Sequence, residues 1–187
     1  MDREVKGMEG NDRKAAGQGA GMKIRGIMES DAAAFLELCI RVEAESEHML
    51  IRPGERSATV GQQRARIAEI VACDNSIILV AEDGGELAGY AAAVGGPYRR
   101  NRHTAHLVIG IREAHCGQGL GTRFFAELEA WARRQGLRRL ELEVTVTNAP
   151  AIALYQKSGF TVEGTRKDAV CVEGEYVDEL YMAKILA

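Results

Sequence analysis

The sequence HCGQGLGTRFFAELEAW occupies residues 115–131 and joins a glycine-rich turn to the clearest helical periodicity in the chain. Apolar residues recur at helical spacing from Leu120 to Gln135, and the next residue is Gly136, so we predict one helix over this range. The residues along its apolar face are Leu120, Phe124, Leu128 and Trp131.

The turn before this helix, Gly117-Gln118-Gly119-Leu120-Gly121-Thr122, has glycines at alternate positions. Alternate glycines let backbone amides face one concavity, and a helix start adds about half a positive charge and unpaired N–H groups. Such a site suits a pyrophosphate. The turn is no Walker A loop, because no Lys-Ser/Thr pair follows, and its G-x-G-x-G spacing differs from the dinucleotide fingerprint. A plain turn that starts a helix is the alternative.

Strands are predicted on both sides of this helix, at Thr104–Ile111 before it and at Arg139–Thr145 after it. A strand, a helix and a strand in succession form a crossover unit, so these two strands are predicted to be parallel neighbours. Turn chemistry at Asp83-Gly84-Gly85 and at Glu173-Gly174 predicts two antiparallel hairpins. The remaining predicted elements are strands at 23–27, 76–82, 86–94, 161–172 and 175–185, a helix capped by Ser30, and helices at 59–73 and 149–158. We therefore predict an α+β fold, with about four helices and a mixed, mostly antiparallel sheet of six or seven strands.

The 187 residues are 46% hydrophobic and 27% charged, which suits one substantial core and no second enzyme domain. Residues 1–21 are charged and glycine-rich, so we expect a disordered N-terminal tail before one domain over residues 22–187. The net charge of −3 argues against a nucleic-acid partner, because the loop Tyr98–His103 is the one basic cluster. Scattered cysteines and the lack of a long apolar run lead us to expect a cytoplasmic protein with no metal and no membrane partner.

A second motif, NAPAIALYQKSGF, occupies residues 148–160. Together with the glycine turn it resembles the GNAT superfamily of acyl-CoA N-acyltransferases, whose pattern is Q/R-x-x-G-x-G/A followed later by N-x-x-A-x-x-L-Y-x-x-x-G-F. The second motif matches at every signature position, whereas Cys116 stands where the family has Gln or Arg. That position is thought to act through its backbone, so we expect cofactor binding to persist and the thiol to be inert. The resemblance covers roughly Lys23 to Ile185 and implies a three-layer fold with the parallel strand pair splayed apart.

The resemblance also implies acetyl-CoA as co-substrate. Its pyrophosphate would lie on the glycine turn, its pantetheine arm would bind backbone groups of the strand before the turn, and Asn148 would contact that arm from the other wall. The residues expected to bind the cofactor are Ile109, Ile111, Gly117, Gln118, Gly119, Gly121, Thr122 and Asn148.

An amine that attacks a thioester needs a free lone pair, and the departing thiolate needs a proton. The resemblance assigns the proton donor to Tyr155, with a plain packing role as the alternative. Glu143 is the first candidate base, because alternation in RLELEV turns it away from the apolar side, and ribosomal-protein alanine acetyltransferases place a glutamate at this offset. His106 is the second candidate, because histidine exchanges protons near neutral pH, and a bound water is the third.

The sequence thus predicts direct transfer of an acetyl group from acetyl-CoA to a primary amine. By similarity to bacterial L-amino-acid and small-amine N-acetyltransferases, the acceptor is expected to be a free amino acid or another small amine. The rival interpretations are a protein N-terminal acetyltransferase of the ribosomal-protein type and a non-catalytic CoA-binding sensor. A dinucleotide-binding module is a weaker rival, because the elements after the turn do not form a longer parallel sheet. Formation of a homodimer stays open.

Overall fold

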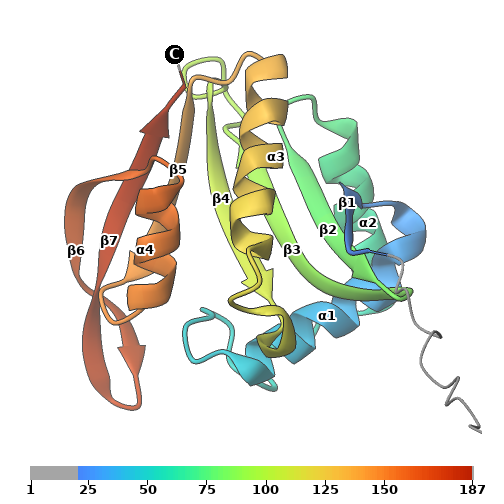
Figure 1. Cartoon of the computed structure of the whole chain (residues 1–187), viewed down its shortest axis with the longest axis horizontal. Coiled ribbons are helices and arrows are strands. Elements are labelled where there is room, and N and C mark those ends of the chain that lie inside the picture. Colours follow the sequence, from blue (N-terminus) through green and yellow to red (C-terminus); the bar gives the residue numbers. More distant parts are fainter. Residues whose placement is uncertain (1–20, 187) are drawn as a thin grey trace, which may run out of the picture.

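The computed structural model describes residues 21–186, which form one seven-stranded sheet with helices on both faces (Figure 1). The strands are β1 (Lys23–Gly26), β2 (Ile77–Asp83), β3 (Glu86–Gly95), β4 (Thr104–Ile111), β5 (Arg139–Thr145), β6 (Thr161–Val172) and β7 (Glu175–Ile185). The helices are α1 (Ala32–Glu45), α2 (Val60–Ala72), α3 (Leu120–Arg134) and α4 (Ala149–Lys157), with 3-10 turns at Glu29–Asp31 and Glu113–His115. The predicted fold class is confirmed. The predicted tail, apart from Gly21, lies outside the described residues.

The strand order is β1-β2-β3-β4-β5-β7-β6, and β4 and β5 are its one parallel pair within the described part of the chain. These two strands pair only between Thr104–His106 and Arg139–Glu141, although both continue for several residues. Beyond that point they diverge, and Figure 1 shows the gap between them widening toward the end of β4. The predicted parallel, splayed pair is therefore confirmed.

Two hydrophobic cores lie on opposite faces of this sheet. Helices α3 and α4 cover one face, where Phe124 and Tyr155 belong to the same buried cluster (Figure 1). Helices α1 and α2 cover the other face, where Phe35 and Ile67 are buried against β2 and β3. No helix within residues 21–186 is both long and apolar enough to span a membrane. Between these layers, the sheet loses its ladder of hydrogen bonds between β4 and β5 beyond His106 and Glu141.

The start of the first helix differs from the prediction in detail. Ser30 lies inside the 3-10 turn, and the N-cap of α1 is Asp31. The Asp31 side chain makes no cap hydrogen bond to α1 and instead accepts the Met28 amide at 2.8 Å. Serine and aspartate are about equally good capping residues, so sequence could not choose between these neighbours. At the second helix the hydroxyl of Thr59 accepts the Gln62 amide at 3.2 Å, which agrees with the predicted start.

Candidate active site

The backbone of β4 is unpaired along much of the edge that faces β5. The His103 carbonyl accepts amides from the start of β5, whereas the Thr104 carbonyl accepts an amide from the β3 side. Because backbone polar groups alternate in direction along a strand, the odd-numbered residues of β4 direct theirs toward β5. The backbone groups of Ile109 and Ile111 therefore point into the gap, where β5 offers no ladder partner. The groups of Ile109 and the Ile111 amide are free for an extended ligand that carries its own amides, whereas the Ile111 carbonyl lies 3.8 Å from the Cys116 sulfur.

The glycine turn forms a group of unpaired donors at the open end of this gap. Gly117 and Gly119 have φ angles of +72° and +79°, a left-handed region that costs other residues about 1–2 kcal/mol. Gly119 is also the N-cap of α3. Among residues 21–186, the backbone amides from Gly117 to Thr122 have no acceptor. Together with the positive end of the α3 dipole, these amides are suited to an anion such as a pyrophosphate.

The other residues of the turn have separate structural roles. The Gln118 side chain donates to the Ala114 carbonyl at 2.8 Å, which leaves its backbone amide as the group available to a ligand. A Cβ added to Gly121 would lie 2.6 Å from Leu154, so glycine permits the close approach of α3 and α4. The exposed Thr122 lies in the first turn of α3. Its hydroxyl has no hydrogen-bond partner in the described part of the chain.

Asn148 and Cys116 flank the gap from its two sides. The Asn148 side-chain oxygen accepts the Ala151 amide at 3.2 Å and so caps α4, leaving the side-chain NH2 group for a ligand. The Cys116 sulfur lies 3.5 Å from the Arg112 carbonyl. The pKa of the Cys116 thiol is raised, mainly by partial burial and also by the negative charge of Glu113. A raised pKa suppresses the nucleophilic thiolate, which agrees with the expected inert thiol.

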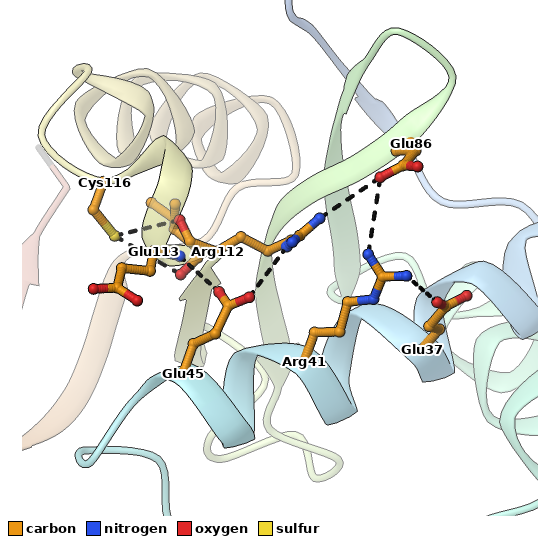
Figure 2. Close-up of polar contacts among 8 residues, drawn as sticks. Glu37, Arg41, Glu45, Glu86, Arg112, Glu113 and Cys116 are labelled. Atoms are coloured by element: carbon orange, nitrogen blue, oxygen red, sulfur yellow. Dashed lines mark hydrogen bonds and ion pairs between the residues drawn. The ribbon is translucent and has the colours of Figure 1, made fainter.

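Polar contacts fasten the base of the glycine turn to α1 (Figure 2). Glu45, the last residue of α1, accepts the Glu113 amide at 2.7 Å and lies 3.4 Å from the Arg112 guanidinium. Arg112 also lies 3.6 Å from Glu86 of β3, which lies 3.9 Å from Arg41 of α1. The loop that follows α1 therefore starts beside the turn that presents the free amides.

Tyr155 lies on the α3–α4 side of the sheet. Its side chain is 7% exposed and packs edge-to-face on Phe125, with 5.5 Å between ring centroids. Burial raises the pKa of Tyr155 to about 12. The phenol makes no hydrogen bond to any residue between 21 and 186. It is thus a protonated donor without a protein partner at neutral pH.

The two predicted bases meet on the opposite face of the sheet. Leu142 and Val144 of β5 are buried in the α3 core, so Glu143 between them points to the α1 side, as alternation predicted. His106 Nε2 of β4 lies 3.3 Å from Glu143 Oε2. Their side chains are 44% and 23% exposed, so this pair is open to solvent and to a ligand. The sequence offers the two as alternative bases, whereas the structure brings them together as a dyad.

Two side chains that the sequence did not single out contact β5, one at Glu143 and the other at Thr145. Arg166 of β6 lies 3.8 Å from Glu143 Oε1 and donates a hydrogen bond of 3.0 Å to Glu179. His48, in the loop after α1, lies 3.4 Å from the Thr145 hydroxyl at the end of β5. No sequence signal marked them, because both contacts depend on register or on a loop path. Within residues 21–186, no three His, Cys, Asp or Glu side chains group as a metal site.

Comparisons with known proteins agree with this architecture. Residues 43–160 match the model of the Acetyltransferase (GNAT) family. The L-amino acid N-acetyltransferase AaaT of Escherichia coli (strain K12) is 32% identical over 150 residues, which cover 78% of this chain and 81% of that protein. The L-methionine sulfoximine/L-methionine sulfone acetyltransferase of Pseudomonas aeruginosa is 32% identical over 107 residues, or 56% of this chain and 62% of that protein.

Among solved structures, the acetyltransferase of the GNAT family from Streptococcus pneumoniae superposes with a TM-score of 0.86 at 29% identity. That superposition covers 89% of this chain and 99% of the other. The family match spans more than half of the chain, and it includes both motifs and the gap between β4 and β5. The chain therefore belongs to the GNAT family and is an acetyl-CoA-dependent N-acyltransferase.

Proposed function

We propose that this enzyme transfers an acetyl group directly to a small primary amine at the gap between β4 and β5. The observation that carries the proposal is the placement of a phenol on one side of the sheet and a His–Glu dyad on the other. Tyr155 lies in the α3–α4 core, whereas His106 and Glu143 lie on the α1 side. An amine can then approach from the α1 face, while Tyr155 contacts the departing sulfur from the α3–α4 face.

The residues that would hold acetyl-CoA fit its chemistry. The free amides from Gly117 to Thr122 suit the pyrophosphate, and the backbone groups of Ile109 together with the Ile111 amide suit the amides of the pantetheine arm. The side-chain NH2 group of Asn148 supplies a donor from the α4 side. Acetyl-CoA supplies the activated acetyl thioester when it is bound.

His106 and Glu143 would act together as the base. A primary amine is protonated near neutral pH, so it must lose a proton before its lone pair can attack. Their 3.3 Å separation lets one partner take this proton while the other stabilises the result. The ammonium nitrogen loses two protons in total as the N–C bond forms and the C–S bond breaks. One ends on the sulfur of CoA, and the other leaves through the solvent-exposed dyad.

Tyr155 would act at the departing sulfur. With a pKa of about 12 its phenol keeps its proton in the presence of a thiolate whose conjugate acid has a pKa of about 8.5. A strong hydrogen bond to the sulfur, rather than complete proton transfer, is therefore the expected contribution. Charge-assisted bonds of this kind are stronger than neutral ones, because the acceptor is ionised.

The names of two relatives support a small acceptor. One acts on L-amino acids and the other on L-methionine sulfoximine and L-methionine sulfone, and all of these carry a primary amine. A free amino acid or a similar small amine is therefore the acceptor that we propose for this chain.

Thiol release from acetyl-CoA tests this proposal when the purified protein is offered amino acids, polyamines, aminoglycosides and short peptides. Release with a small amine is expected in the wild type. Tyr155→Phe and Glu143→Gln should each lower kcat by about 10²- to 10⁴-fold, while acetyl-CoA affinity stays within about threefold. Tyr98→Phe is the matched control, because this tyrosine is 73% exposed and lies in the loop before β4. Full activity in Tyr155→Phe would remove the proposed role of that residue.

A further inference from the structure

We infer that Arg166 and Glu143 form a paired receptor for the two charges of a free α-amino acid, which rests on the proposed amine acetylation. In this arrangement Glu143 receives the ammonium group and Arg166 receives the carboxylate. The inference narrows the acceptor from small amines in general to zwitterionic α-amino acids.

The first support is the spacing of the two charges. Arg166 Nη1 lies 3.8 Å from Glu143 Oε1. This distance is longer than a hydrogen bond, so the two charged groups are neighbours that are not hydrogen-bonded to each other. An α-amino acid carries its ammonium and carboxylate groups on one carbon atom. Its two charges therefore match, in sign and in proximity, the opposite charges that Glu143 and Arg166 present.

The second support is the unused donor capacity of Arg166. A guanidinium has five N–H donors in a fixed fork that matches a carboxylate. The contacts of Arg166 with Glu143 and Glu179 both use Nη1, so Nε and Nη2 have no partner in the described part of the chain. The side chain is 55% exposed, so these donors can reach a ligand.

The third support is that no other cation competes for this role. Within residues 21–186, the basic groups within 4 Å of Glu143 are His106 and Arg166. Arg139, the nearest arginine along β5, is bound to Glu141 at 2.6 Å and to Glu163, and it is 20% exposed. A carboxylate that enters beside the dyad is therefore met by Arg166.

The arrangement also orients the amine for reaction. Glu143 bridges the two neighbours, with Oε2 toward His106 and Oε1 toward Arg166. An ammonium group held on Glu143 is thus beside the histidine that would share its proton. An amine that lacks the carboxylate would keep its contact with Glu143 but lose the second contact that fixes its position.

The test compares each of the twenty L-amino acids with its α-carboxamide as acceptor, for the wild type and for Arg166→Gln. The wild type should prefer the best free amino acid over its amide by about 10- to 150-fold in kcat/KM, the range of one charge-assisted hydrogen-bonded contact. In Arg166→Gln, KM for the amino acid should rise by a similar factor while kcat/KM for the amide changes less than about threefold.

Lys167→Gln is the matched control, because it removes a neighbouring charge on β6 that pairs with Asp178 at 2.7 Å instead of with the dyad. It should leave the preference for the free amino acid unchanged. Equal losses of kcat/KM on the amino acid and on its amide in Arg166→Gln would show that Arg166 only positions Glu143. Equal kcat/KM for amides and free amino acids in the wild type would also overturn the inference. Either result leaves amine acetylation standing, whereas absence of thiol release with every acceptor, despite acetyl-CoA binding, would refute the proposed function itself.

Discussion

Replacing Arg56 with methionine tests how the loop between α1 and α2 is held in place. Glu43 near the end of α1 is 2% exposed, and both its oxygens accept from Arg56 Nε, at 2.8 and 3.1 Å. Arg56 lies in the loop and is itself 16% exposed. The same loop carries His48 to the end of β5, next to the dyad. Arg56→Met would leave a buried carboxylate without its partner.

The expected cost is about 3–5 kcal/mol in the free energy of unfolding, because the remaining charge stays desolvated and unpaired. For a domain of this length, 1 kcal/mol corresponds to about 2–4 °C in Tm, so Tm should fall by about 6–20 °C. Urea unfolding monitored by the fluorescence of Trp131 gives the free energy directly. The double variant Glu43→Leu/Arg56→Met should recover most of the loss, because replacing both partners by apolar groups is often neutral.

Acceptor kinetics separate stability from loop position. Both Arg56→Met and the double variant lack the ion pair that fixes the loop, so KM for the acceptor should rise in each of them. In the double variant this rise should persist although Tm has recovered, while acetyl-CoA affinity stays normal. A loss below about 1 kcal/mol in Arg56→Met would refute the buried-pair reasoning, because the contact would then behave as an exposed ion pair.

Three further substitutions test the glycine turn, a hairpin tip and the start of α1. Gly119→Ala should lower stability by about 1–2 kcal/mol and weaken acetyl-CoA binding in a calorimetric titration, because φ is +79° at the centre of the anion site. Gly174→Ala, with φ of +89° at a hairpin tip, should show the same strain with normal acetyl-CoA affinity; equal affinities in the two variants would contradict the assignment. Asp31→Asn should destabilise at pH 7, because the hydrogen bond from Arg25 lowers the pKa of Asp31. That stabilisation is present above the unfolded pKa of about 3.9 and is lost as pH falls through the lower folded pKa, so urea midpoints of wild type and variant should converge in acid; a constant gap would refute this linkage.

The parts of the fold that could be predicted from sequence are those with local causes. The helix after the glycine turn follows from its apolar periodicity, and the direction of Glu143 follows from its place between Leu142 and Val144. Each of these inferences needs only a window of several residues. The crossover between β4 and β5 needed one additional rule, that a strand, a helix and a strand pack with parallel strands.

The parts that could not be predicted depend on register between strands. Alternation assigns His106 and Glu143 to faces, yet it does not say which residues of β4 and β5 stand opposite each other. The register pairs His106 with Glu141, and this brings the dyad to 3.3 Å. The position of Arg166 beside Glu143 could not be predicted either. Strand β6 is exposed along its first eight residues, and its register shifts on either side of Arg166. A strand exposed on both faces has no alternating pattern from which the direction of its side chains could be predicted.

The register also places the dyad at the vertex of the splayed pair. His106 is the last residue of β4 that pairs with β5, and Glu143 lies two residues beyond its partner Glu141. Before this point backbone hydrogen bonds close the ladder between β4 and β5. After it, the backbone groups of β4 that face β5 have no partner on β5, while those on the other edge stay paired with β3. A ligand that satisfies those groups from the open end must stop where the ladder begins, because the backbones leave no further room. In the proposed mechanism the reactive end of such a ligand would therefore lie at the dyad, and the length of the closed ladder would determine where the acetyl group is transferred.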